Sequence, residues 1–276
     1  FRMNTGIEFK NNWGADIGLI GRPRAYSNTA LRGGPRFRYS EEFVNWIYIG
    51  TDSRKKFHFI LGTVMSKSKQ DHESYFRLET RFSYQPTNAL NISLSPEFSI
   101  NKNKTQYVSE RSFMDDSRYI TAEIDNHTLS ASVRINYSIN PNLSIQYYAE
   151  PFVSRGTYTN YNYITNPVAD DLNDRFMLYD DDQISFDDGV YHIDENRNGT
   201  TDYSFGEPDF AYVQYRSNLV VRWEYIPGSE IFLVWSQGTT GLGDPSDSLF
   251  ESIDKEIIQQ KKDNTYLIKA TFRYVF

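Results

Sequence analysis

The chain has 276 residues, no cysteine and a formal net charge of −7. A disulfide framework and a thiolate zinc site are therefore excluded, and the acidic balance argues against a nucleic-acid partner, because phosphate binding needs a basic surface. Aromatic residues make up 16% of this polar chain, yet no apolar run approaches the roughly 18 residues of a membrane helix.

The first segment, FRMNTGIEFK, lacks the basic and apolar regions of a signal peptide, and we expect the chain to begin inside a strand. The first two or three strands are poorly bounded. A hairpin is predicted around the turn TDSRKK, with Trp46 and Tyr48 before it and Phe57, Phe59 and Leu61 after it. His58 has the opposite parity to Phe57 and Phe59, which is typical of a hydrogen-bonded histidine that faces a barrel lumen.

Three clearer hairpins follow along the chain, centred on the turns QPTNAL, SINPNLS and YIPGSE. On both sides of each turn, apolar and polar residues alternate with the period of two that places successive strand side chains on opposite faces. The turns contain Asn, Pro, Gly and Ser, which favour tight reversals. No helix of useful length is expected, and about twelve strands are visible.

The connections differ between the two ends of these strands. Short turns join one end, whereas the other end is joined by SKSKQDHE and by polar segments at about 102–118, 157–210 and 240–263. Outer-membrane β-barrels have short periplasmic turns and long extracellular loops. The sequence therefore favours an all-β, antiparallel transmembrane β-barrel over 1–276, and leaves open whether these strands close alone or belong to a larger barrel. A soluble glycan-binding β-sandwich remains the alternative.

Charged residues of both signs fall on the non-apolar parity of the strands, as expected for a barrel lumen in which charges pair across neighbouring strands. The predicted lumen-facing residues are Arg77, Glu79, Arg81, Glu97, Arg134, Glu150, Arg222, Glu224, Lys269 and Arg273.

The predicted loop at about 157–210 is acidic and contains the stretch DENRNGTTDY from residue 194. Asp194, Asn196 and Asn198 occupy the alternate positions of a calcium loop, with Gly199 at the sharp turn. Phe205 replaces the bidentate glutamate of an EF-hand, so Asp202 or Glu207 would have to complete the shell. The sequence predicts calcium held by Asp194, Asn196, Asn198 and Asp202; the alternative is a solvated turn.

The stretches DENRNGTTDYSFGEPDF, YRSNLVVRWEYIPGSEIFLVWSQG and NTYLIKATFRYVF, together with LRGGP at 31–35, resemble a family of Bacteroidota outer-membrane proteins. In that family a carbohydrate-binding-like N-terminal domain precedes a C-terminal β-barrel of unassigned function. The resemblance implies that this chain is the barrel part and that it lies in the bacterial outer membrane. The resemblance does not indicate an enzymatic reaction for this chain.

The ending YLIKATFRYVF resembles the last strand of such a barrel, where Tyr274 and Phe276 match the signal read by the barrel-insertion machinery. We therefore expect a protein in contact with outer-membrane lipid that binds or passes a polar ligand such as a glycan, or joins an envelope assembly with other proteins. An outer-membrane hydrolase with a rim active site is the enzymatic alternative, but no spacing of His with Asp or Ser nominates catalytic residues.

Overall fold

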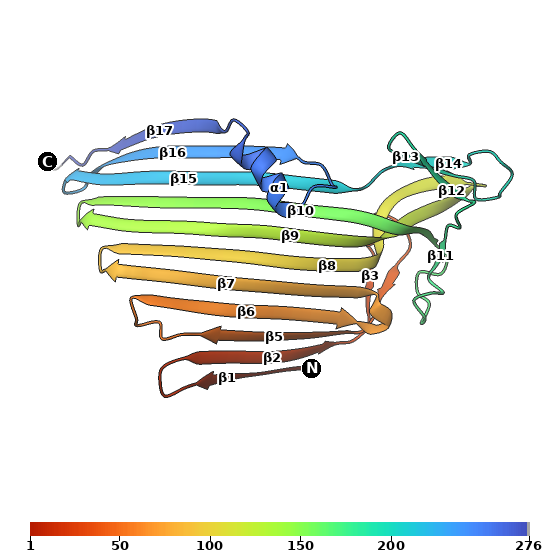
Figure 1. Ribbon diagram of the computed structural model, residues 1–276, viewed down its shortest axis with the longest axis horizontal. Helices are drawn as coiled ribbons and strands as arrows, with labels where there is room; N and C mark the ends of the chain where they lie inside the picture. The colour runs from red at the N-terminus through yellow and green to blue at the C-terminus, as the bar shows by residue number, and fades with distance from the viewer. Residues whose placement is uncertain (275–276) are drawn as a thin grey trace.

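The computed structural model describes residues 1–274 and consists almost entirely of β-strands (Figure 1). The main antiparallel sheet has the order β1-β2-β5-β6-β7-β8-β9-β10-β15-β16-β17, and short β11 (Phe176–Leu178) also pairs with β10. Its strands are β1 (Arg2–Glu8), β2 (Gly14–Arg22), β5 (Glu42–Gly50), β6 (Phe57–Ser68), β7 (Glu73–Thr87), β8 (Leu90–Phe113), β9 (Asp116–Asn140), β10 (Leu143–Ile164), β15 (Phe210–Ile226), β16 (Ser229–Leu242) and β17 (Asp263–Thr271).

Smaller elements lie at one end of these strands. They are the hairpin β3 (Ala25–Ser27) and β4 (Phe37–Tyr39), the three-stranded sheet β12 (Ile184–Asp187), β13 (Val190–Ile193) and β14 (Tyr203–Gly206), and the helical turns η1 (Lys69–Asp71), α1 (Leu249–Ile253) and η2 (Asp254–Ile258). Within residues 1–274, no helix has the length and apolar character needed to cross a membrane.

The predicted asymmetry between the strand ends is present (Figure 1). The connections at one end, which we call the turn end, are 9–13, 51–56, 88–89, 141–142 and 227–228. The other end, the loop end, carries 23–41, 69–72, 114–115, 165–209 and 243–262.

Several predicted boundaries are wrong at the loop end. The segment at about 102–118 is mostly strand, because β8 and β9 extend to a turn at 114–115. Both faces of this extension carry polar side chains, which removes the alternation on which the prediction depended. The acidic segment at about 157–210 begins as β10 and contains four further short strands. The connection near 240–263 contains the short helical elements α1 and η2, whereas the sequence predicted no helix of useful length.

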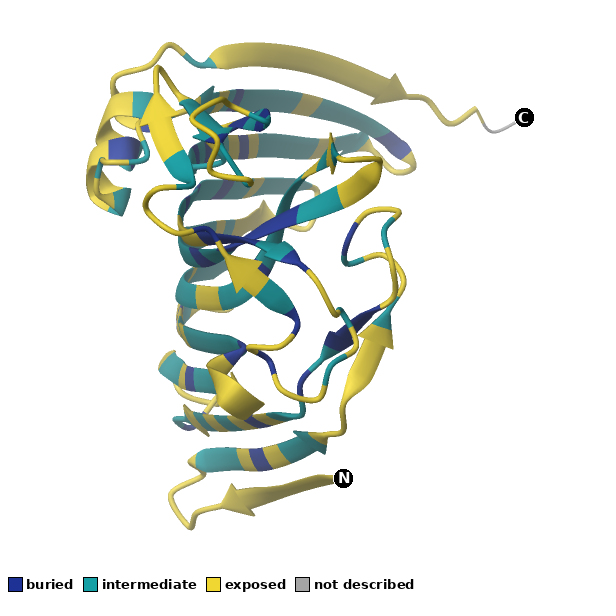
Figure 2. Cartoon of the chain, turned by 90° about the vertical axis from the view of Figure 1, so that its right-hand side faces the viewer, coloured by how far each residue is buried: buried dark blue, intermediate teal, exposed yellow. Residues whose placement is uncertain are grey.

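The main sheet curves, with α1 on its convex side and most loop-end segments on its concave side (Figure 2). It is one layer thick over most of its length, so the buried clusters gather near the loop end. One cluster surrounds Ile193 and Phe205, a second surrounds Leu31 and Phe37, and a third joins Val153 and Val213 to Ile257.

Among residues 1–274, β1 pairs only with β2, and β17 pairs only with β16. The sheet therefore has two free edges. Both edge strands run from the loop end toward the turn end (Figure 1).

Candidate functional site

Strand register sorts the side chains of the main sheet into alternating rows. One row runs across eight strands and is apolar or aromatic throughout: Phe57, Tyr84, Ile92, Ile135, Tyr147, Leu219, Trp235 and Tyr266. The adjacent row, one residue along each strand, is polar throughout: His58, Ser83, Ser93, Arg134, Tyr148, Asn218, Ser236 and Thr265. Because adjacent strand residues point to opposite faces, the sheet has an apolar face and a polar face.

The two faces also differ in their surroundings. The helical segment packs against Val153 and Val213, which share the parity of Leu219, so the apolar face is the convex one. Large side chains on this face stay exposed, including Phe57 and Leu233. A soluble sandwich would bury such a face under a second sheet. No second sheet lies over it in residues 1–274, and the soluble-sandwich alternative does not match this architecture.

The register also fixes the face of nine predicted lumen residues. Arg77, Glu79, Arg81, Glu97, Arg134, Glu150, Arg222, Glu224 and Lys269 all lie on the polar, concave face. Arg273 follows the end of β17, where its backbone N–H donates to Ser229 Oγ at 3.0 Å. That the concave face encloses a lumen stays a prediction.

Trp46 and Tyr48 lie on the polar face as well, opposite to Phe57, Phe59 and Leu61 of the same hairpin. Both parities of β5 are apolar, so the sequence alone did not assign Trp46 and Tyr48 to a face. Trp46 Nε1 donates a hydrogen bond to Asp16 Oδ1, and Tyr48 accepts one from Arg77 at 3.2 Å, so their polar atoms are satisfied on the concave side.

Two adjoining depressions on the concave face share Arg81, Ser95 and Glu97. The smaller, of about 310 Å³, extends toward Tyr48 and Glu79. The larger, of about 500 Å³, is lined by Arg81, Ser83, Asn91, Ser93, Ser95, Glu97, Ser130, Ser132, Arg134 and Glu150. Serine hydroxyls both donate and accept hydrogen bonds and leave space above the sheet, so this surface suits a ligand rich in hydroxyl groups.

The charges in the larger depression are incompletely paired within the described part of the chain. Arg81 and Glu97 form no ion pair there, and Arg134 lies over the Tyr148 ring, 4.6 Å from its centroid. Glu79 and Glu97 are direct cross-strand neighbours, an unfavourable pairing that Arg77 reduces through its 3.3 Å contact with Glu79. Glu97 and Arg81 are therefore the charges most open to a ligand.

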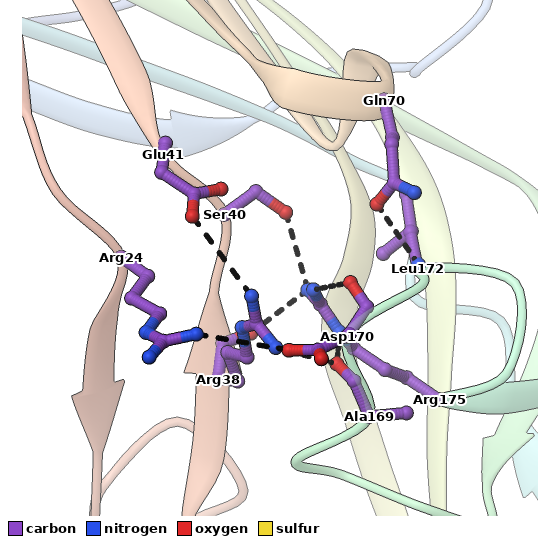
Figure 3. A network of polar contacts seen from close by, with 9 residues as sticks. All are labelled: Arg24, Arg38, Ser40, Glu41, Gln70, Ala169, Asp170, Leu172 and Arg175. Carbon is purple, nitrogen blue, oxygen red and sulfur yellow. Dashed lines mark hydrogen bonds and ion pairs between the residues drawn. The ribbon is translucent and has the colours of Figure 1, made fainter.

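Two loops meet at the rim of the concave face through a network of arginines (Figure 3). Arg38 on β4 forms an ion pair with Asp170 from the β10–β15 connection, and Arg24 lies 3.8 Å from the same carboxylate. Arg175, only 1% exposed, donates to the carbonyl oxygens of Ala169, Asp170 and Arg38, and to Ser40 Oγ. Burial, followed by the charge of Arg38, lowers the pKa of Arg175.

The predicted calcium residues all lie in the turn between β13 and β14. Both Asp194 oxygens accept backbone N–H groups, from Asn198 at 3.0 Å and Gly199 at 2.7 Å, and Asp202 accepts from the Asn196 amide at 2.9 Å. Residues 1–274 contain no group of three or more His, Cys, Asp or Glu side chains placed to hold a metal ion. The calcium site stays a prediction, and the turn has hydrogen bonds of its own.

The four histidines do not form a site together. His58 is on the polar face as predicted, and His127 Nε2 lies 3.0 Å from Asp125. His72 is fully buried, with Nε2 2.7 Å from Thr105 Oγ1. Burial and the charges of Arg175 and Lys104 lower the pKa of His72 to about 3.

The fold and this surface define an all-β protein with a long antiparallel sheet, apolar on its convex face and polar on its concave face. The chain belongs to the family described as a domain of unknown function (DUF5916), whose profile matches residues 1–274. No curated protein matches it significantly.

Two solved structures are similar to the chain at low identity. A NanC porin is 10% identical, with 99% of this chain and 92% of the porin covered and a TM-score of 0.30. The copper transporter OprC is 11% identical, with 98% of this chain and 40% of the transporter covered and a TM-score of 0.41.

The Bacteroidota origin and the additional N-terminal domain implied by the sequence resemblance stay predictions. So does the insertion signal, because Phe276 lies outside the described residues and Tyr274 follows the last strand without entering it.

Proposed function

We propose that the chain forms the wall of a bacterial outer-membrane β-barrel whose concave face binds or passes a polyhydroxylated ligand such as a glycan. The observation that carries this proposal is the alternation of complete apolar and polar rows across eight strands. Lipid can cover an exposed apolar face on a sheet one layer thick, while the opposite face stays wet.

Aromatic residues near the turn end support a membrane boundary there. Trp223, Tyr225 and Phe272 form a contiguous group, with ring centroids 6.0 and 6.3 Å apart, and Tyr84 and Tyr137 expose their rings at the same end. Outer-membrane barrels carry such aromatic girdles at the interfaces between lipid and water.

The free edges support membership of a larger barrel. A free strand edge inside lipid leaves backbone groups unpaired, which costs several kcal/mol per group. Since β1 and β17 run in the same direction, direct closure would pair them in parallel and give an odd number of strands. An odd number of further strands between them would restore antiparallel pairing and the even count of bacterial barrels.

Ligand binding tests the proposed role of the concave face. We expect detergent-solubilised protein to bind at least one member of a panel of soluble oligosaccharides in isothermal titration calorimetry. Glu97→Gln should weaken that binding by about tenfold, because one charge-assisted hydrogen bond contributes about 1.5 kcal/mol or more.

Glu224→Gln is the matched control, since Glu224 has the same chemistry on the same face but lies near the turn end, beside Arg222. Equal effects of the two substitutions, or no binding by any oligosaccharide, would contradict the ligand assignment. Recovery of the protein in the aqueous fraction after lysis without detergent would contradict the membrane assignment.

A further inference from the structure

The helical segment α1–η2 lies flat against the convex face of the main sheet. Ile257 packs on Val153 and Val213, and Leu249 and Ile253 adjoin the same cluster. The segment contacts β9 and β10 at its start and β15 and β16 at its end, so its axis crosses the strands instead of following them (Figure 1). Because barrel strands cross the membrane at a tilt, a segment that lies across several strands runs around the barrel wall and does not follow the strands through the membrane.

Polar contacts fix the segment in this position. Ser248 and Glu251 form a capping box at its start. Arg155, on the convex face of β10, donates to the carbonyl oxygen of Asp247 at 2.7 Å, and Lys255 pairs with the Asp247 carboxylate at 2.6 Å. The segment is therefore a docked element of the wall.

The segment lies at the height where the apolar band ends. Val213 is about 12 residues from Tyr225 at the turn end of β15, which corresponds to about 40 Å along the strand and about 30 Å along the membrane normal at a usual barrel tilt. The apolar band of such barrels is about 25 Å tall. On β10, the next convex-face residue after Val153 toward the loop end is Arg155, so the apolar band has ended there.

The two flanks of the segment differ in chemistry. Ser252 and Glu256 lie beside Gly243, just beyond the loop end of β16, and Lys255 reaches Asp247, so this flank faces the loop end. Phe250 precedes Ser252 by two residues, which is about 200° around a helix axis, so helical spacing places it on the opposite flank, toward the turn end. Phe250 is 75% exposed and Ile258 is 66% exposed, although the other large apolar residues of the segment pack on the sheet.

We propose that α1–η2 is an interfacial anchor whose Phe250 and Ile258 side chains insert into the outer leaflet at the boundary between headgroups and acyl chains. This inference rests on the proposed membrane location. Lipid is the occupant that the geometry favours, because the exposed side chains continue the apolar face at its loop-end border. The segment also lies flat on the wall with one apolar side exposed, as interfacial amphipathic helices do at a membrane surface. Phe43, near the loop end of β5, is another exposed aromatic residue on the convex face.

The absence of cysteine from the chain makes a clean test possible. Single substitutions Phe250→Cys, Ile258→Cys, Lys255→Cys and Leu233→Cys are each labelled with a nitroxide, and the proteins are reconstituted into phosphatidylcholine vesicles. The relative accessibility of each label to oxygen and to a soluble nickel chelate then reports its depth. Labels at Phe250 and Ile258 should show an oxygen-to-nickel ratio several-fold above that of Lys255 and below that of Leu233, because Leu233 lies deeper, in the apolar band.

The four positions separate the two proposals. Lipid-like values at Leu233 with aqueous values at Phe250 and Ile258 would overturn the anchor and leave the membrane assignment intact. Aqueous values at Leu233 would overturn the membrane assignment itself. Labels at Phe250 and Ile258 that are shielded from both reagents, with dipolar broadening between molecules, would show that a second copy covers this flank and would also overturn the anchor.

Discussion

Replacing Arg175 should release the two rim loops from each other while the main sheet stays folded. Arg175 is buried and donates hydrogen bonds to three carbonyl oxygens and one hydroxyl, which join the β10–β15 connection to β4. Arg175→Met removes all four donors and leaves buried acceptors unpaired. Each hydrogen bond to a charged group contributes about 1.5–3 kcal/mol, and these contributions are not additive.

The gain from removing a buried charge next to Arg38 offsets part of this loss. We expect a net cost of about 3 kcal/mol, at the lower end of the range for breaking a buried ionic contact. This corresponds to about a hundredfold increase in local opening. Hydrogen exchange followed by mass spectrometry should show the increase in peptides covering 165–175 and 25–39, with β9 and β10 unchanged.

Arg24→Met is the matched control. Arg24 is exposed and contacts the exposed Asp170 carboxylate at 3.8 Å, so its loss should cost less than about 1 kcal/mol. Equal exchange in the two variants, or no change in Arg175→Met, would contradict the role of Arg175 in joining the two loops.

Three further predictions concern pH, metal and packing. Burial, followed by the charge of Glu42, raises the pKa of Glu73 at the loop end of β7 to about 7, above its ordinary value of 4.5, so the folded protein binds this proton more tightly than the unfolded chain does. The stability of this rim should therefore fall as pH rises from about 4.5 to 7. Glu73→Gln should flatten this pH dependence when it is measured by hydrogen exchange. An unchanged pH dependence in the variant would contradict the role of Glu73. If the β13–β14 turn holds calcium, a chelator and Asp194→Ala should each increase proteolysis in 194–202 while the strands β12, β13 and β14 stay protected. An unchanged cleavage pattern with both treatments would reject the metal. Gly62→Ala should destabilise the protein by about 1–3 kcal/mol, because a Cβ there would lie 2.3 Å from the Tyr48 ring; a denaturation midpoint equal to wild type would contradict this packing.

The alternation of side chains predicted the hairpins around QPTNAL, SINPNLS and YIPGSE because each strand there has one apolar and one polar parity. It did not assign Trp46 and Tyr48 to a face, because Ile47 and Ile49 make the other parity of β5 apolar as well. In the β8–β9 extension polar side chains occur on both faces, so the alternation is weak there, although Ile120 and Ala122 pack in the cluster around Ile193. Sequence patterns therefore reveal strands most clearly where one face is apolar.

The rim network was not predictable from local patterns. Arg38 and Asp170 are 132 residues apart, and neither has a neighbour in sequence that indicates the contact. The helical segment did have a signal, since Ser248 and Glu251 have capping-box spacing before the apolar pair Ile257 and Ile258. The acidic composition of 157–210 obscured the aromatic residues of this segment that are buried in the cluster around Ile193, among them Tyr161 and Phe205.

Two adjacent valines on β15 test most directly whether the convex face meets lipid. Val220 and Val221 are identical side chains at nearly the same height on β15, one on the concave face and one on the convex face. In folding into lipid vesicles, Val221→Arg should cost about 2–4 kcal/mol, the usual penalty for arginine on the lipid face, as should Leu219→Arg and Leu233→Arg. Val220→Arg should cost far less, because arginine there faces water. Equal free energies of unfolding for Val220→Arg and Val221→Arg would contradict the account.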